Sequence, residues 1–443
     1  MRSSSFAPEE RFAHRLLGSI LLIGLAIIFL GISLTGQDVF REPKALALKG
    51  LGVILLATAG ILLVQGKLPW RNPLRQVPAL AIPLAAVLWT SIATVFSTRR
   101  GVSLETLQFV TAAAAVAATA LFLAAAAARR GSSAAGRLPG LWIAIALALI
   151  NGLVLTSQWL GWKPLELDPR YISHHLGRTA LIGNPNEVGT FMIAPALAAL
   201  VLAMVSRGRM RWVAGGTAAA LALFLVLSGT RTAVAAFLAA IFALTLTISL
   251  RRALLISVAA VGILAVSVIV SPRFLRFDVI TDAIERRDMD VLLSGRVVAF
   301  TTAADMARQR PLIGLGPGTF SNHYFQWKIQ AQEQHPRLLF SGSAAKNFGE
   351  AHNDHLELVI EGGVPAYLLF LAALVTLGSG SFRRKPVGAL IEARFARACA
   401  FPLAVALFVV TLAQFPLQVA GPATMFLYLG SLICSWSRLD EAD

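Results

Sequence analysis

The sequence has few charged residues for its length. Of its 443 residues, 14% are charged and 56% are hydrophobic. A soluble domain carries roughly 25% charged residues, so a cytosolic α/β enzyme and a disordered chain are both excluded. Cysteine is scarce as well. The only two, Cys399 and Cys434, lie in apolar stretches, so no disulfide framework is predicted.

Long hydrophobic runs are what the sequence has instead. A helix needs about 20 apolar residues to cross roughly 30 Å of hydrocarbon, and about twelve runs approach that length. The runs are 16–35, 45–64, 78–96, 105–128, 141–160, 188–205, 212–229, 232–250, 253–270, 355–378, 394–413 and 416–436. They predict an all-α fold, a polytopic transmembrane bundle of about 12 spans. No secretory signal is expected, because the first run is long and no small-residue cleavage site follows it.

The spacing of these runs predicts three segments. Residues 1–270 form nine transmembrane helices with short loops. Residues 271–354 form one large outer loop that contains short helices and carries catalytic residues. Residues 355–443 form the last three transmembrane helices and a cytoplasmic C-terminus.

The basic residues indicate the orientation of the bundle. The chain has 39 Lys and Arg against 23 Asp and Glu, a net charge of +16. With a cytoplasmic N-terminus, about half of these basic residues fall on the inside, as the positive-inside rule requires. The charge is therefore mostly a topology signal, and no nucleic-acid partner is predicted. Six of the seven histidines then lie outside: His174, His175, His323, His335, His352 and His355. ATP and nucleotide sugars are absent from that face of the membrane, so a substrate that reacts there must arrive already activated.

Two arginines at this outer face are candidates for binding an anion. Arg231 lies in the short connection 228–232 (SGTRT), where it either snorkels to the interface or clamps a phosphate. Arg296 follows Gly295 at the start of a predicted amphipathic helix, 297–309, where backbone N–H groups and a guanidinium meet. An ordinary solvated first turn is the alternative there.

Two further segments have simpler structural explanations. Arg178 precedes 183–187 (GNPNE), in which Pro185 keeps Asn184 extended. Asn186 or the following glutamate would then cap the helix that begins near 188, and capping alone would explain the motif. The stretch 314–318 (GLGPG) looks like a phosphate-binding loop but lacks the following Gly-Lys-Ser/Thr, so we predict a tight turn.

The segment in which the outer loop re-enters the membrane is the richest in titratable residues. If it is helical throughout, His352 and His355 share one face, and Asp354, Glu357 and Glu361 share the opposite face. A metal site made from this helix alone would need ligands from both faces, so none is predicted, although a carboxylate from elsewhere in the chain could complete one. We expect His352 to act as a general base or to orient a hydroxyl, and the carboxylates to hold local structure. An interfacial histidine with a satisfied hydrogen bond is the alternative.

Together these residues suit transfer from a lipid diphosphate, since arginines stabilise the leaving group and a histidine activates the nucleophile. The segments, over about 80–378, resemble the O-antigen ligase and polymerase superfamily of the bacterial inner membrane. The motifs that carry the resemblance are SGTR at 228–231, SGR at 294–296, GNPN at 183–186, the turn 314–320 and HNxxL at 352–356. The resemblance implies a GT-C-like glycosyltransferase with a periplasmic active site and an undecaprenyl-diphosphate-linked glycan donor. It implies an inverting transfer that needs no metal or other cofactor.

The resemblance also implies roles for individual residues. Arg231 and Arg296 would hold the diphosphate, and His352 would activate the acceptor hydroxyl. The remaining candidates for binding the diphosphate or glycan are Arg178, Asn184, Asn186, Asn353 and His355, of which His355 stands at a variable position of its motif.

Several functions fit these motifs. An O-antigen ligase, with lipid A–core as the acceptor, is the first expectation. A glycan polymerase with a lipid-linked acceptor is the second, and a protein O-oligosaccharyltransferase the third, since the modest loop 271–354 lacks an obvious extra domain. A transporter or flippase would place broken or charged helices at mid-bilayer in two related halves. Here the polar residues gather at one surface, which favours an enzyme.

Overall fold

The computed structural model describes residues 8–33, 38–68, 77–129, 139–162, 178–247, 262, 277–286, 288–293, 295–341, 344–383 and 390–438. Within these residues all regular structure is helical. The long helices are α1 (Pro8–Leu30), α2 (Arg41–Val64), α4 (Ala81–Val95), α5 (Arg100–Arg129), α6 (Pro139–Trp159), α7 (Pro185–Val205), α8 (Gly208–Leu227), α9 (Arg231–Thr247), α16 (Asp354–Gly378), α17 (Ile391–Thr411) and α18 (Ala420–Trp436). The short ones are η1 (Pro78–Leu80), α12 (Phe277–Glu285), α13 (Met289–Leu292), α14 (Val297–Gln309), α15 (Phe320–Gln334), η4 (Pro336–Phe340), η5 (Ser379–Phe382) and η6 (Pro416–Gln418).

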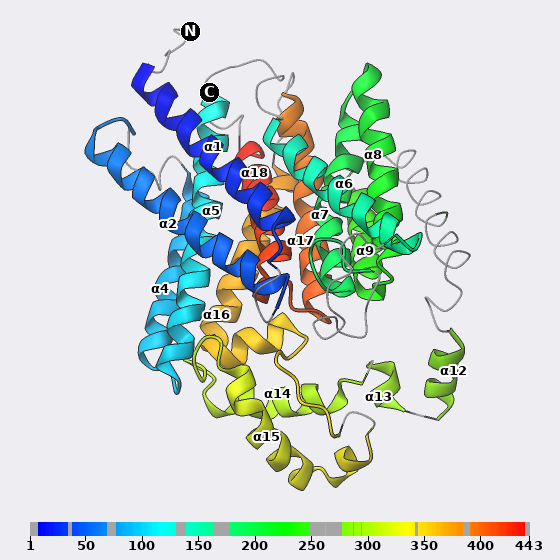
Figure 1. The fold of residues 1–443 in the computed structure, drawn as a ribbon. Helices are drawn as coiled ribbons and strands as arrows, with labels where there is room; N and C mark the ends of the chain where they lie inside the picture. The colour runs from blue at the N-terminus through cyan, green and yellow to red at the C-terminus, as the bar shows by residue number, and fades with distance from the viewer. Residues whose placement is uncertain are drawn as a thin grey trace.

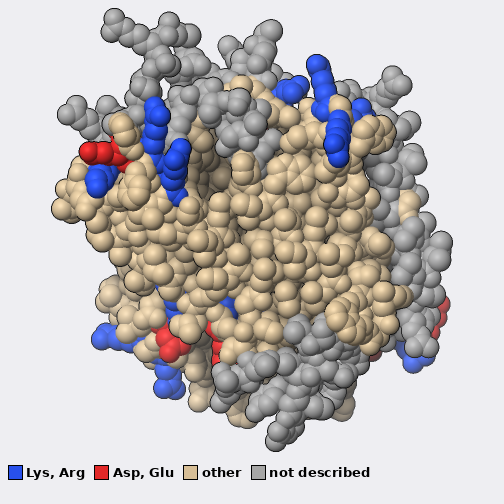
Figure 2. Space-filling model, turned by 45° about the horizontal axis from the view of Figure 1, so that its top comes forward, with Lys and Arg blue, Asp and Glu red and all other residues tan. Residues whose placement is uncertain are grey.

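Nine helices in the described ranges are long and apolar enough to cross a membrane. The helix α9 is apolar but shorter, and α18 is a further 17-residue helix. Eleven of the predicted runs coincide with these helices, which confirms a polytopic helical bundle. The run 253–270 lies outside the described residues, apart from residue 262. Figure 2 shows a broad band without Lys, Arg, Asp or Glu between two charged rims on the visible face.

The centre of the bundle is α7, which is buried on nearly all sides. Its residues from Glu187 to Ala203 are almost all buried, and it packs against α8, α17 and α18. The helices α2 and α4 instead leave large apolar side chains exposed, among them Leu46, Val53 and Leu88, as contact with lipid requires. The central position of α7 matters for function because its first turn reaches the site described below.

The two ends of the bundle differ (Figure 1). The N- and C-termini lie at one end of the bundle. The helices α12–α15 lie beyond the opposite end of the bundle, which we call the loop end. The predicted amphipathic helix 297–309 is confirmed as α14, with Ala299, Ala303 and Met306 buried against α15 and α16. The short helices between α9 and α16 therefore build a small helical layer over one end of the bundle.

This layer is fastened to the membrane bundle by the glycine-rich stretch 314–318, which is a tight turn as predicted. The helix α16 is kinked at Gly363, whose φ is 71°, so some carbonyl groups before the kink are free to accept other bonds. Leu315 N–H donates to the Ile360 carbonyl at 2.7 Å, and Gly316 N–H donates to the Glu361 carbonyl at 3.0 Å. On the other side, the Ser103 hydroxyl donates to the Pro317 carbonyl at 2.8 Å. The turn thus joins the layer to α5 and α16.

We expect Gly363→Ala to destabilise the protein by about 2–4 kcal/mol. The left-handed backbone at Gly363 disfavours a side chain, and a Cβ there would collide with the Leu312 carbonyl. The measurement is thermal unfolding of the purified protein in detergent. Gly349→Ala is the matched control, because its Cβ would meet no atom within 4 Å and its φ is not positive. Equal melting temperatures for the two variants would show that the kink does not hold the layer.

Candidate active site

The connection between α17 and α18, residues 412–419, is the floor of the candidate site. The Ala413 carbonyl accepts a hydrogen bond of 2.8 Å from Nη1 of Arg296. Nε2 of Gln414 donates to the Thr232 hydroxyl, next to Arg231, at 3.0 Å. The ring of Phe415 lies 4.8 Å from the ring of His352, centroid to centroid. One short turn therefore gathers groups that come from three distant parts of the chain.

Two of the predicted arginines lie near one another. Arg296 is the N-cap of α14 and follows Gly295, whose φ of 74° lets the chain turn into the helix. Arg231 is the first residue of α9. Arg296 donates to the Ala413 carbonyl and Gln414 donates to Thr232, so adjacent residues of the turn bring the two arginines close together. Burial and the positive charge of Arg231 lower the pKa of Arg296. Two like charges held close together, each at the N-terminus of a helix, favour binding of an anion.

The segment 183–187 packs on the turn before Arg231. The Thr230 hydroxyl donates to the Pro185 carbonyl at 2.8 Å. Arg178 reaches the same turn, since a Cβ on Gly229 would lie 2.7 Å from Nη1 of Arg178. The structure thus brings Arg178 and the start of α7 to the turn that leads into Arg231.

The prediction of the cap of α7 was wrong by two or three residues. The helix begins at Pro185, and Asn184 is its N-cap, accepting a hydrogen bond of 2.9 Å from the backbone N–H of Asn186. The reason is that proline suits the first helical position, where no N–H is needed. Asn184 therefore has a structural role that needs no ligand, and Glu187 is left for another partner.

His352 lies before α16, in left-handed backbone with a φ of 53°. Such a conformation costs a non-glycine residue about 1–3 kcal/mol, so its surroundings must hold it. The ring packs edge-on between Phe348 and Phe415. Its Nδ1 is buried and has no hydrogen-bond partner within the described part of the chain. Burial and the positive charges of Arg296 and Arg41 lower the pKa of His352 to about 3, so the imidazole is neutral at physiological pH.

The predicted helical face shared by His352 and His355 is wrong, because α16 begins only at Asp354. Asn353 is its N-cap and accepts a hydrogen bond of 3.1 Å from the backbone N–H of Leu356. The ring of His355 packs against Tyr367, Phe370 and Phe408. Its Nε2 lies 2.9 Å from the Thr411 hydroxyl and 3.2 Å from the Phe408 carbonyl. These contacts indicate that Asn353 and His355 shape the helix and its packing.

The three carboxylates of α16 hold local structure, as predicted. Asp354 accepts a hydrogen bond of 3.0 Å from the backbone N–H of Leu417, which fixes the floor of the site. Glu357 accepts one of 3.1 Å from the N–H of Ala351, next to His352. Glu361 accepts bonds from two N–H groups of the glycine-rich turn and the start of α15. Among the residues that the structure describes, no three or more His, Cys, Asp or Glu side chains form a group that could hold a metal ion.

Arg41 is a site residue that the sequence analysis missed. It is the first residue of α2, and its Nε donates to Oε1 of Glu187 at 2.7 Å, while Nη1 donates to Oε1 of Glu350 at 3.0 Å. Its Cζ lies 5.4 Å from the centroid of the Phe415 ring. The sequence places Arg41 only among the basic residues at the outer ends of helices, and no motif surrounds it.

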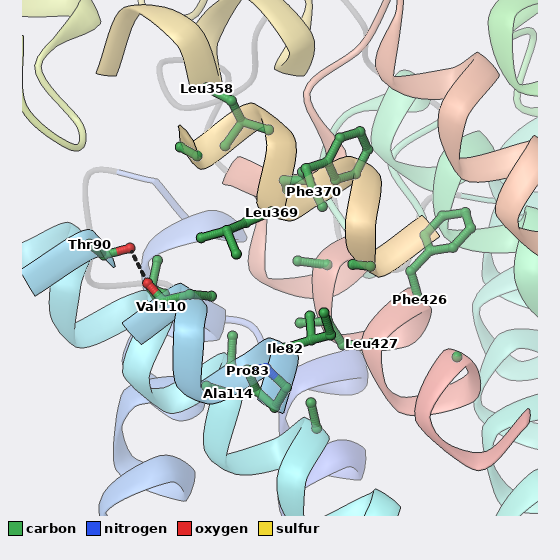
Figure 3. Close-up of a pocket in the computed structure, with 18 of the residues that line it drawn as sticks. Ile82, Pro83, Thr90, Val110, Ala114, Leu358, Leu369, Phe370, Phe426 and Leu427 are labelled. Atoms are coloured by element: carbon green, nitrogen blue, oxygen red, sulfur yellow. Dashed lines mark hydrogen bonds between the residues drawn. The ribbon is translucent and has the colours of Figure 1, made fainter. Parts of the chain in front are cut away.

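A cavity of about 350 Å³ opens between α4, α5, α16 and α18, close to the floor of the site. Figure 3 shows apolar side chains from all four helices around it, including Ile82, Val110, Leu369 and Phe426. Leu417 of the floor also lines the cavity. Along α16 the lining residues run over most of the helix, from Leu358 to Leu377, or roughly 28 Å at 1.5 Å per residue. The cavity is therefore long, apolar and directed along the helices of the bundle.

Some residues of interest lie outside the described part. Ser294 of the SGR motif does so, and so do His174 and His175.

Residues 216–371 match the family model described as O-antigen ligase. The matched region contains Arg231, Arg296 and His352, whereas Arg41 and Arg178 lie outside it. No curated protein matches the chain.

Proposed function

We propose that the chain, whose residues 216–371 match the O-antigen ligase family model, transfers a glycan from undecaprenyl diphosphate to an acceptor sugar hydroxyl. The acceptor that we propose is lipid A–core, which makes the protein an O-antigen ligase. One observation carries the proposal. A half-buried, neutral histidine and two neighbouring arginines converge on the turn 412–419, at the end of a membrane bundle.

The arginines suit a lipid diphosphate. In the proposed reaction, the bond between the anomeric carbon of the glycan and the diphosphate oxygen breaks, and its electron pair leaves with the diphosphate. This adds one negative charge to a group that Arg231 and Arg296 already hold. Guanidinium groups fixed in advance stabilise that charge without having to reorganise, as the bond from Arg296 to the Ala413 carbonyl implies.

His352 suits the acceptor. The acceptor hydroxyl attacks the anomeric carbon from the side opposite the diphosphate, which inverts the configuration, and its proton passes to the imidazole of His352. The low pKa of His352 keeps a nitrogen unprotonated for this purpose. Bound diphosphate opposes the positive charges that lower this pKa, so donor binding makes His352 a stronger base. His355 is omitted from the proposed site because its ring nitrogen is already used by Thr411 and Phe408.

The apolar cavity supports a donor with a hydrocarbon tail. It begins at Leu417, two residues from the Phe415 ring that contacts His352, and runs along α16. A polyprenyl chain lying in it would bring the diphosphate toward the arginines. We place the loop end in the periplasm of the bacterial inner membrane, with both termini cytoplasmic, as the distribution of basic residues favours.

We expect Ala366→Phe to raise the KM for a long-chain polyprenyl donor about tenfold, because the new ring fills part of the cavity and removes roughly two buried methylene groups from the ligand. The measurement compares long-chain and short-chain donors in the same transfer assay. Leu88→Phe on the exposed face of α4 is the control for adding a ring to the bundle. An equal rise in KM with the short-chain donor would argue against a tail in this cavity.

Ligase and polymerase functions differ in what accumulates without the enzyme. In cells from which the gene is deleted, a ligase leaves complete lipid-linked polymer and core without O-antigen. A polymerase leaves single lipid-linked repeat units. We expect polymer to accumulate; accumulation of single units would contradict the ligase proposal while leaving the donor chemistry intact.

A further inference from the structure

The guanidinium of Arg41 is divided between a buried partner and an accessible one. Its Nε and Nη2 both contact Oε1 of Glu187, whose side chain is only 6% exposed. Its Nη1 contacts Oε1 of Glu350, whose side chain is 27% exposed. One edge of Arg41 is therefore fixed within the bundle, and the other edge is presented at a surface that solvent reaches.

The accessible edge lies at the candidate active site. Arg41 and His352 both pack on the ring of Phe415. The positive charge of Arg41 acts on His352 together with that of Arg296. Arg41 is thus a third guanidinium at the site, and it approaches from α2, an element different from those that supply Arg231 and Arg296.

Glu350 is not needed to hold the backbone around His352. The next residue, Ala351, is fixed by the bond from its N–H to Glu357. Asn353 on the other side of His352 caps α16. The contact between Glu350 and Arg41 can therefore break without releasing the histidine.

Building on the proposed function, we propose that Arg41 is a third diphosphate-binding arginine whose accessible edge is occupied by the Glu350 carboxylate until the donor displaces it. A phosphate group can accept the hydrogen bond from Nη1 of Arg41 that the Glu350 carboxylate accepts, but the phosphate groups also interact with Arg231 and Arg296. Glu350 is near solvent and can turn outward, while Glu187 keeps Arg41 in place. Glu350 thus competes with the donor for Arg41 and forms an ion pair with it while no donor is bound.

The test is binding of geranylgeranyl diphosphate to the purified full-length protein in detergent, with geranylgeraniol as the phosphate-free probe. Glu350→Gln should lower the Kd for the diphosphate about threefold to tenfold, because the competing charge is gone. Arg41→Lys should raise the Kd for the diphosphate about tenfold, because a lysine keeps the positive charge beside Glu187 but lacks the several N–H donors of a planar guanidinium. The gain from Glu350→Gln should disappear in the Arg41→Lys background, and no variant should change binding of the alcohol.

Two controls make the same kinds of substitution at other charged residues. Glu333→Gln removes an exposed carboxylate from α15, and Arg100→Lys alters an exposed arginine at the start of α5. Both should bind the diphosphate as the wild type does. A Kd that rises or stays unchanged in Glu350→Gln would overturn the inference, and a rise would indicate that the pair instead holds the site together.

The outcomes separate this inference from the proposed function. If the wild type binds the diphosphate and Arg296→Ala weakens binding, while neither Arg41→Lys nor Glu350→Gln has any effect, only the inference about Arg41 fails. If the wild type binds the diphosphate and the alcohol equally well, both the inference about Arg41 and the diphosphate site of the proposed function are contradicted.

Discussion

Arg296→Ala is expected to reduce the rate of glycan transfer about 10²- to 10³-fold. The Arg296 guanidinium is fixed by the Ala413 carbonyl and lies near Arg231, so it is already placed where negative charge increases as the donor bond breaks. Because that charge is absent from the bound donor and develops in the transition state, kcat should fall more than KM rises. The measurement is steady-state transfer by the purified variant with a lipid-diphosphate donor.

Arg308→Ala is the matched control for this variant. Arg308 lies on the same helix, α14, but it is exposed and pairs with Asp305 at 2.9 Å. Its replacement should leave both kcat and KM near the values of the wild type. If Arg308→Ala and Arg296→Ala lost activity equally, the loss would reflect damage to α14 rather than loss of charge at the diphosphate.

His352→Ala is expected to lower transfer about 10²- to 10⁴-fold, since a positioned base contributes about that much. The ring is held by Phe348 and Phe415, and its backbone is held by the bonds on either side, so the loss should come from chemistry. His335→Ala is the control, because His335 is an exposed histidine of the same loop. Full activity in His352→Ala would remove the histidine from the mechanism.

The pH profile gives a second readout for His352. Its pKa in the donor-free protein is lowered to about 3, so the neutral form predominates at every pH above about 4. The value of kcat/KM, which reports the free enzyme, should therefore show no inflection between pH 5 and pH 8 that depends on His352. The inflection in kcat should lie at higher pH than that in kcat/KM, because bound diphosphate raises the pKa. An inflection of kcat/KM near pH 6.5 would contradict the buried, positively charged surroundings of the ring.

Much of the fold could be predicted from the sequence because it depends on local composition. Long apolar runs define the spans, and the start of α14 after Arg296 follows from its amphipathic spacing. The structural role of Glu361 and its two neighbouring carboxylates was predictable from their shared helical face. The pairing of His352 with His355 failed for a local reason. Asn353 is a favourable N-cap, so the helix starts after it. His352 therefore lies before the helix and does not share a helical face with His355.

The rest of the site depends on contacts between distant segments. The turn 412–419 has no motif, and its main contribution to Arg296 is a backbone carbonyl that any residue would supply. Arg41 is some 300 residues from Glu350 in sequence. The two meet only because the start of α2 lies beside the segment that leads into α16. Glu187 was predicted as a possible cap, although its carboxylate instead pairs with Arg41. Without the structure, neither partner identifies the other.

The most direct test is transfer by the purified protein in liposomes that contain a defined undecaprenyl-diphosphate-linked glycan and lipid A–core, with and without EDTA. The wild type should release one undecaprenyl diphosphate for each glycan transferred, with inverted anomeric configuration and equal rates in both arms. Arg296→Ala and His352→Ala should release almost none. Undiminished transfer by either variant would contradict the assignment of the active site, and no transfer by the wild type would contradict the proposed reaction itself.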